Sequence, residues 1–173
     1  MPETSRLILR RPRLDDAEPF AAVNADPEVA RFVSASGPLA RAESDLLLRK
    51  MIEHWDDHGF GLWMADVRAT GELAGFVGLA HPGTLAALAH EVEVGWRLGR
   101  AHWGQGLATE GGAAAVRIAF EERRLERLVC IIAAENTRSL GVAHKLGFAF
   151  WRDMDHPRWP AGVEIHTLDR PTG

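Results

Sequence analysis

The spacing of apolar and polar residues predicts helices and strands in the middle of the chain. Over residues 42–57, apolar side chains recur three and four positions apart and Gly59 follows, which predicts an amphipathic helix that ends at this glycine. Residues 60–67 and 72–80 are rich in apolar side chains and flank a short loop that contains Gly71. Because glycine adopts the backbone angles that tight turns require, we expect these two segments to form an antiparallel hairpin.

Shorter elements are expected on both sides of this region. The pattern predicts strands over 6–11, 127–134, 148–151 and 162–168, and helices over 15–24, 26–32 and 136–146. Asp15 is the expected N-cap of the first helix, and a loop around 156–160 is expected between the last two strands. Because these elements alternate over 173 residues without a repeat, we expect a single α/β domain over 1–173, with a frayed tail at 170–173.

The run 91–110 joins a predicted strand, a glycine turn and the start of a predicted helix. In the strand, carboxylates fall on one face at Glu91 and Glu93, and apolar side chains fall on the other at Val92, Val94, Trp96 and Leu98. Gly104 and Gly106 then permit a tight backbone path into the alanine-rich helix predicted over 107–120. A glycine turn that opens a helix presents free N–H groups and the positive end of the helix dipole, so it is typical of phosphate binding.

Composition argues against several other classes of protein. A formal charge of −4 disfavours a protein whose main partner is the nucleic-acid backbone, and no run approaches the roughly 18 apolar residues of a membrane span. The start of the chain lacks the apolar segment of a signal peptide and Cys130 is the sole cysteine, so we expect a cytoplasmic protein without an internal disulfide. His54 and His58 lie four residues apart, but no third ligand is evident and we expect no metal.

Four segments of the sequence point to a known family. They are residues 4–10 with 15–17, residues 93–96, residues 103–110, and residues 136–139 leading to 145–148. In this order they resemble the GNAT superfamily of acyl-CoA-dependent N-acetyltransferases, and within it the branch of ribosomal-protein N-terminal acetyltransferases. The resemblance implies a mixed, mostly antiparallel sheet of six or seven strands, splayed open in its middle and flanked by about four helices. It also implies that acetyl-CoA lies in this opening.

The resemblance further implies which residues hold acetyl-CoA. Backbone N–H groups from His102 to Leu107 would bind the phosphates, although Ala101 stands where the family has Arg or Gln. The edge of the strand over 91–99 would pair with the amides of the pantetheine arm, and a bulge at Gly95 would free this edge. The predicted cofactor-binding residues are Val94, Trp96, Leu98, His102, Trp103, Gly104, Gln105, Gly106, Leu107, Ala108, Asn136 and Ser139.

Direct acetyl transfer requires the protein to remove a proton from the amine, polarise the thioester carbonyl and protonate the departing thiolate. Glu93 matches the family's strand glutamate and is the first candidate for the base, with Glu91 second. In many relatives a tyrosine acts as the general acid, but this chain contains no tyrosine and has Ala143 at that position. Ser139 is the nearest substitute, with helix capping as its alternative role.

The acceptor is constrained by the free energy of forming a neutral amine. At pH 7 this costs about 1 kcal/mol for an α-amine and over about 4 kcal/mol for a lysine side chain. Together with the resemblance, this difference favours the N-terminus of a protein or peptide, with small amines as the alternative. The expected walls of the acceptor site are residues 34–38, the helix that carries Trp55, and the loop of Trp151 and Trp159.

Two other functions stay open at the level of the sequence. A non-catalytic acyl-CoA-binding module would explain the missing tyrosine. A nucleotide- or dinucleotide-binding protein would also use a glycine turn, but Thr109 stands where the dinucleotide fingerprint has Gly or Ala, and no Lys-Ser or Lys-Thr phosphate loop occurs. The sequence is compatible with either a monomer or a homodimer.

Overall fold

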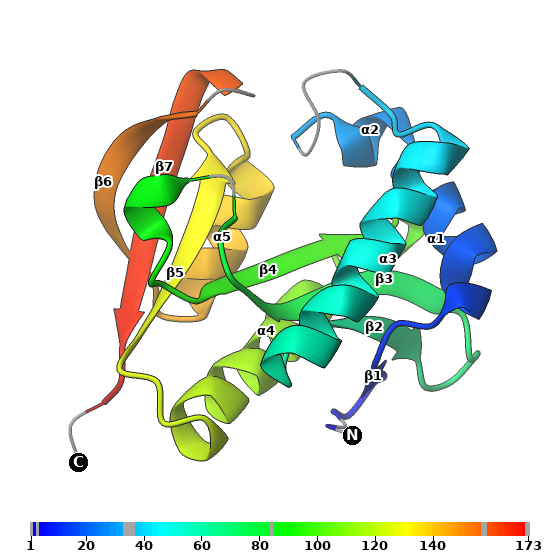
Figure 1. Ribbon diagram of the computed structural model, residues 1–173, viewed down its shortest axis with the longest axis horizontal. Coiled ribbons are helices and arrows are strands. Elements are labelled where there is room, and N and C mark those ends of the chain that lie inside the picture. The colour runs from blue at the N-terminus through cyan, green and yellow to red at the C-terminus, as the bar shows by residue number, and fades with distance from the viewer. Residues whose placement is uncertain (1, 3, 33–36, 84, 157–158, 172–173) are drawn as a thin grey trace.

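The computed structural model describes residues 2, 4–32, 37–83, 85–156 and 159–171, and its centre is a seven-stranded sheet (Figure 1). The strands are β1 (Leu7–Arg10), β2 (Leu62–Val67), β3 (Leu73–Ala80), β4 (Glu93–Leu98), β5 (Arg127–Ala133), β6 (Ala149–His156) and β7 (Trp159–Asp169). They are ordered β1-β2-β3-β4-β5-β7-β6, and every neighbouring pair except β4 and β5 is antiparallel. The mixed, mostly antiparallel sheet is therefore confirmed.

The sheet opens between β4 and β5. These parallel strands pair at Glu93 and Val129 and then diverge (Figure 1). On its other side, β4 pairs with β3 along its whole length without a register shift, so the bulge predicted at Gly95 is wrong. The edge of β4 is freed because β5 turns away from it. The splay that the resemblance implied is confirmed, but its cause is the divergence of two strands.

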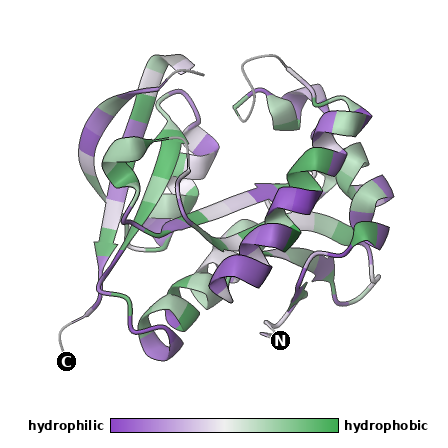
Figure 2. Ribbon diagram, viewed as in Figure 1, coloured by the Kyte–Doolittle hydropathy of each residue, from purple (hydrophilic) through white to green (hydrophobic). Residues whose placement is uncertain are grey.

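Helices cover both faces of the sheet. They are α1 (Ala17–Asn24), α2 (Pro27–Ala30), α3 (Arg41–His58), α4 (Leu107–Arg117) and α5 (Thr137–Lys145). On one face, Phe20 of α1 and Leu48 of α3 pack in a cluster with Phe76 of β3. On the other face, Leu107 of α4 belongs to a larger cluster that contains Val94 of β4. The strand β5 is almost entirely apolar (Figure 2), as expected for a strand inside the sheet.

The helix α4 lies unusually close to the sheet because glycine faces it. A Cβ atom at Gly111 would lie 2.6 Å from Val77 Cγ1, which is too close for any larger residue without a shift. A second glycine, Gly112, faces Leu146 at a similar distance, 2.7 Å from Leu146 Cδ1. These two contacts pack the middle of α4 closely against Val77 of β3 and against Leu146.

The central local predictions are confirmed. The helix α3 ends at Gly59, whose φ of 67° is left-handed, and β2 and β3 form the predicted hairpin with Gly71 at a φ of 75°. The helix predicted over 107–120 continues as a π-helical turn from Ile118 to Glu122. Among the residues that the structure describes, no helix is long and apolar enough to cross a bilayer.

Two local predictions are wrong. The N-cap of α1 is Asp16 instead of Asp15, and the Asp16 carboxylate accepts the Arg13 N–H at 2.7 Å instead of capping the helix. The loop predicted around 156–160 is largely strand, since β6 reaches His156 and pairs there with Trp159, residues 157–158 lying outside the described chain. Most side chains of β6 are exposed and many are polar, so backbone pairing with β7 builds this edge strand without an apolar pattern.

The C-terminal residues show a further difference from the expected tail. The Arg170 backbone N–H donates to the Glu126 carbonyl at 2.8 Å, and its side chain pairs with the Glu126 carboxylate at 2.5 Å. The ordered chain therefore continues at least through Arg170.

Candidate active site

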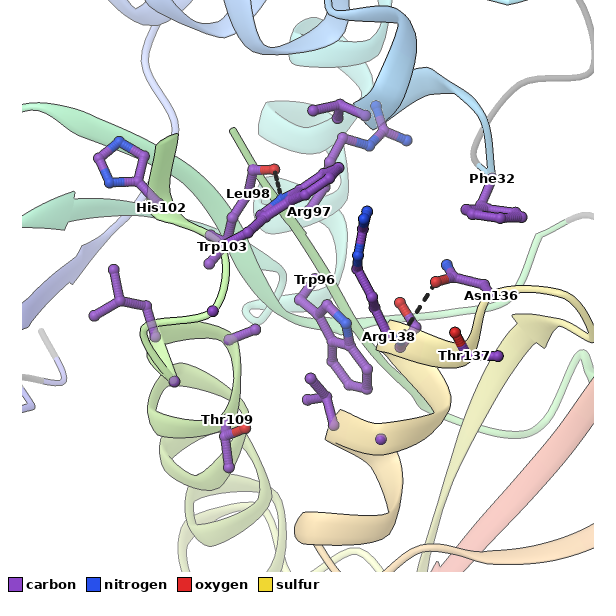
Figure 3. Close-up of a pocket in the computed structure, with 18 of the residues that line it drawn as sticks. Phe32, Trp96, Arg97, Leu98, His102, Trp103, Thr109, Asn136, Thr137 and Arg138 are labelled. Atoms are coloured by element: carbon purple, nitrogen blue, oxygen red, sulfur yellow. Dashed lines mark hydrogen bonds between the residues drawn. The ribbon is translucent and has the colours of Figure 1, made fainter. Parts of the chain in front are cut away.

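A cavity of about 480 Å³ lies along the opening between β4 and β5 (Figure 3). Residues of α2, β4, the turn that follows β4, the first turn of α4 and the start of α5 line it. The predicted cofactor-binding residues that line this cavity are Trp96, Leu98, His102, Trp103, Gly104, Gly106, Leu107, Ala108, Asn136 and Ser139. The structure therefore brings together two segments that are about 30 positions apart in the sequence.

The turn before α4 has the backbone geometry of an anion-binding loop. Gly104 and Gly106 have φ values of 72° and 78°, a left-handed conformation that glycine adopts without strain. Gly106 is the N-cap of α4, and no side chain of the described residues caps this helix. The first N–H groups of α4 are therefore left for a ligand, at the positive end of the helix dipole.

Hydrogen bonds from Arg6, near the start of the chain, hold this turn in place. The Arg6 side chain donates through Nε to Glu110 Oε2 and through Nη1 to the Gln105 carbonyl, each at 2.7 Å. The Arg6 backbone N–H donates to the other Glu110 carboxylate oxygen at 2.7 Å. Although burial opposes the shift, hydrogen bonds from Thr4 and Arg6 lower the pKa of Glu110. Gln105 lies outside the cavity lining, because its carbonyl binds Arg6 and its side chain donates to the Ala101 carbonyl at 2.9 Å.

The open edge of β4 carries free backbone groups. The carbonyl of Val94 accepts from Cys130 Sγ at 3.3 Å, and the carbonyl of Leu98 accepts from Trp103 Nε1 at 2.7 Å (Figure 3). Both carbonyls therefore point away from β3. Because backbone groups alternate along a strand, those of Trp96 point the same way, and no described residue pairs with them. Val94 itself is 2% exposed and does not line the cavity.

The start of α5 forms the opposite wall. Asn136 is the N-cap of α5, and its Oδ1 accepts the Ser139 backbone N–H at 3.2 Å (Figure 3). The side-chain amide nitrogen of Asn136 is left for other contacts. The Ser139 hydroxyl has no hydrogen-bond partner among the described residues. Capping and cofactor binding, which the sequence posed as alternatives for Asn136, are therefore compatible.

The two candidate carboxylates are separated by the start of β4. Glu93 is the residue at which β4 and β5 last pair, and burial raises the pKa of its carboxyl to about 7. It does not line the cavity, and it lies close enough to Cys130 that burial and the Glu93 charge both raise the pKa of that thiol. Glu91 precedes the strand, and its carbonyl accepts from His81 Nδ1 at 3.2 Å. The prediction that both carboxylates share one face of one strand is therefore wrong.

The predicted acceptor walls are largely elsewhere in the fold. Trp55 is 7% exposed and packs against Trp63, with ring centroids 5.6 Å apart, so it belongs to the core. Trp151 and Trp159 lie on β6 and β7, outside the cavity lining. Of the predicted wall at 34–38, residues 34–36 lie outside the described residues. Phe32, Trp96 and Trp103 supply the aromatic lining instead.

Several lining residues were missed by the sequence reasoning. They are Glu28, Val29 and Phe32 of the α2 region, Arg97 of β4, and Thr109, Thr137, Arg138, Gly141, Val142 and Lys145. The Arg138 guanidinium lies over the Trp103 ring at 4.5 Å and so connects the two walls (Figure 3). Arg97 could have been found from strand alternation, because this pattern places it on the same face of β4 as the candidate base Glu93.

In the pair His54 and His58, both ring nitrogens of His54 form hydrogen bonds. His54 Nδ1–H donates to the Phe60 carbonyl at 2.9 Å, and His54 Nε2 accepts the His81 backbone N–H at 3.2 Å. Burial lowers the pKa of His54, which agrees with this neutral tautomer. Within the described ranges, no group of three or more His, Cys, Asp or Glu side chains is placed to hold a metal ion.

Comparisons with known proteins agree with this geometry. The sequence model of the acetyltransferase (GNAT) domain matches residues 6–149. The uncharacterized N-acetyltransferase p20 of Bacillus licheniformis is 28% identical over 146 residues, which cover 84% of this chain and 80% of that protein. The acetyltransferase structure from Agrobacterium tumefaciens C58 is 26% identical with a TM-score of 0.82, over 98% of this chain and 95% of that one.

A more distant structural neighbour was solved with the cofactor. The ribosomal L7/L12 α-N-protein acetyltransferase RimL, in complex with CoA, has a TM-score of 0.78 over 98% of this chain and 97% of that one, at 14% identity. The split sheet, with a glycine turn and helix N-terminus at its opening, thus defines an acyltransferase fold of the GNAT type. The domain match covers most of the sequence, and the chain belongs to the GNAT acetyltransferase family.

Proposed function

We propose that this protein transfers an acetyl group from acetyl-CoA directly to a primary amine, and that this amine is the α-amine of a protein or peptide. A small amine is the second candidate. The observation that supports this proposal most directly is that the glycine turn, the free edge of β4 and the start of α5 line one cavity. The structural likeness to a ribosomal-protein acetyltransferase with bound CoA supports this choice.

Acetyl-CoA would be held mainly by backbone groups. A helix N-terminus contributes roughly 0.3–2 kcal/mol to an anionic contact, whereas a micromolar ligand needs about 8 kcal/mol. The free backbone groups of Trp96 on the edge of β4 would supply part of the remainder by pairing with the amides of the pantetheine arm. The side-chain amide of Asn136, on the opposite wall, is placed to contribute a donor.

Glu93 would accept the proton of the attacking amine. A carboxyl with a pKa of about 7 is partly ionised at neutral pH and is matched to the task of a general base. Because Glu93 does not line the cavity, the proton would pass through a water molecule. Glu91 is the alternative base, although the structure places it before β4, with its charge near Arg127.

The departing thiolate makes a smaller demand on the protein. A thiol has a pKa near 8.5, so its anion leaves without a strong acid, and the absence of tyrosine does not prevent turnover. The Ser139 hydroxyl lines the cavity and is free to donate a hydrogen bond to the sulfur or to a water.

An acceptor screen that detects CoA release tests the proposal. The panel contains peptides with varied N-terminal residues, the same peptides with blocked N-termini, and small primary amines. We expect release with free N-terminal peptides and none with blocked ones. Tight binding of acetyl-CoA without release from any acceptor would instead favour the non-catalytic acyl-CoA-binding module. Release with small amines alone would favour the second candidate.

A further inference from the structure

Arg97 lines the cavity with a partly buried side chain that carries a positive charge. Its Nη1 donates to Asn24 Oδ1 at 2.6 Å, and its guanidinium lies 5.1 Å from the centroid of the Phe76 ring. Its Nε is buried and has no hydrogen-bond partner among the residues that the structure describes. No carboxylate among the described residues forms an ion pair with it. Burial lowers the pKa of Arg97 to about 10, so the side chain is still charged at neutral pH.

The partner of Arg97 is itself held in place. Asn24 Nδ2 donates to Ser44 Oγ at 2.8 Å, and Asn24 and Ser44 are 1% and 0% exposed. This bond orients the Asn24 side chain so that its oxygen faces Arg97. A neutral amide and an aromatic ring lower the energy of a buried cation but do not neutralise it. No described carboxylate therefore pairs with this cation.

The side of the sheet on which Arg97 lies indicates where such an anion would come from. Trp96 and Leu98 pack toward the cluster of α4, whose N-terminus faces the proposed phosphates. Arg97 alternates with them and projects to the opposite side, among residues of α1 and α2 (Figure 3). Glu28 and Phe32 also line the cavity. The anion therefore belongs on the acceptor side, apart from the phosphates of acetyl-CoA.

We propose that Arg97 binds a carboxylate of the acceptor, so that the preferred acceptor is an amine with a carboxylate a few bonds away. This assignment rests on the proposed acetyl transfer. The carboxylate could be an Asp or Glu side chain near a peptide N-terminus or the carboxylate of a free amino acid, since both present the same group to the guanidinium. Glu28 adds a negative group to the same cavity, which suits the positively charged form in which the amine arrives.

Matched acceptors test the assignment on the unaltered protein. A peptide that begins Ser-Asp is compared with the same peptide beginning Ser-Asn, because the two share the same N-terminal residue and differ by one carboxylate. We expect kcat/KM for CoA release to be on the order of 10- to 100-fold higher with the acidic peptide, as for a hydrogen bond to a charged group. A free amino acid and its amide form the second pair, which distinguishes the two sources of the carboxylate.

Variants assign the preference to Arg97. Arg97→Gln should lower kcat/KM for the acidic peptide by on the order of 10- to 100-fold and leave the Ser-Asn peptide within about twofold. Arg97→Lys, which keeps the charge, should recover part of the loss. Arg127→Gln is the matched control, since it removes an arginine that pairs with Asp169 at 2.6 Å away from the cavity. Calorimetry should give an acetyl-CoA affinity unchanged within about twofold in all three variants.

Four results would overturn the assignment. They are equal activity of the unaltered protein on both peptides, equal losses for both peptides in Arg97→Gln, a preference that survives in Arg97→Gln, and a weakened affinity for acetyl-CoA in that variant. The last would show that the anion is a phosphate of the cofactor. If Arg97→Gln fails to fold, the comparison of peptides on the unaltered protein decides alone. Absence of release from every acceptor would refute the proposed function itself, whereas release without discrimination refutes this assignment alone.

Discussion

Replacing Glu93 by Gln keeps the shape of the side chain and removes the proposed base. General base catalysis contributes about 10²- to 10⁴-fold, so we expect kcat/KM to fall by that factor, equivalent to about 3–5 kcal/mol of transition-state stabilisation. The affinity for acetyl-CoA should stay within about twofold, because Glu93 lies outside the cavity lining. CoA release and calorimetry measure the two quantities.

The pH dependence gives a second readout of the same group. Burial raises the pKa of Glu93 to about 7, so kcat/KM of the unaltered protein should rise as the pH passes through about 7, and Glu93→Gln should lack this rise. The acceptor also titrates, near pH 7.8 for an α-amine. Two acceptors whose amines differ in pKa separate the effects, since the inflection due to Glu93 stays in place while that of the amine moves.

Stability should change with pH in the opposite direction. The pKa of Glu93 is raised from 4.5 to about 7 by burial, so between these values the unfolded chain loses the proton that the folded protein keeps. The unfolding free energy should therefore decline by up to about 3 kcal/mol from below pH 4.5 to above pH 7. Denaturant unfolding of Glu93→Gln should lack this decline.

Glu91→Gln is the matched control for both experiments, and we expect activity within a few-fold of the unaltered protein. The reasoning is refuted if Glu93→Gln keeps more than a tenth of the activity, or if the inflection near pH 7 persists in it. A large loss of activity in Glu91→Gln alone would assign the role of general base to Glu91. A pH-independent difference in stability between Glu93→Gln and the unaltered protein would show that burial does not set the pKa.

Three further variants test other parts of the site and the fold. Arg6→Ala should weaken the binding of acetyl-CoA several-fold but leave kcat/KM for a phosphate-free acetyl-pantetheine donor unchanged. Arg127→Ala is the control. Equal losses with both donors would contradict a role of Arg6 in holding the phosphate-binding turn. Gly106→Glu should lower the affinity for acetyl-CoA at least about tenfold, as measured by calorimetry, because it adds a negative charge and strains a backbone φ of 78°. An unchanged affinity would mean that the phosphates bind elsewhere. Trp55→Ala should lower the unfolding free energy by about 3–5 kcal/mol. At a temperature where this variant is folded, its KM for the acceptor should be unchanged. An altered KM would instead show that Trp55 contributes to the acceptor site.

The parts of the fold that the sequence predicted are those with strong local signals. The helix α3 repeats its apolar residues with helical spacing and ends at a left-handed glycine, and the β2–β3 hairpin turns at another. The extent of β6 carries no such signal, because its side chains are mostly exposed and its partner β7 supplies the stabilisation through the backbone. The split of the sheet depends on how two distant strands diverge, which the residues of β4 alone do not encode.

The same distinction applies to the candidate site. Most lining residues between Trp96 and Ala108 were predicted because they lie in one continuous motif. Phe32 lines the cavity as a result of tertiary packing and stands in no motif that the sequence reasoning used, whereas Arg97 lies within the strand of that motif and was passed over because it is neither a carboxylate nor apolar. Trp55 was misplaced because a helical period shows which side of a helix is apolar, without showing whether that side faces a ligand or the core.

The two halves of the proposed reaction place different demands on the protein. Acetyl-CoA would be held by backbone groups of the glycine turn and of β4, which depend on the path of the chain more than on side chains. The thiolate leaves without a strong acid, so the missing tyrosine removes little that the donor side needs. Proton removal would instead depend on Glu93, the proposed base, whose pKa is raised by burial. Under these proposals, the side-chain chemistry would be concentrated on the face of β4 that Glu93 and Arg97 share. Variants on this face should therefore alter acceptor choice more than cofactor affinity.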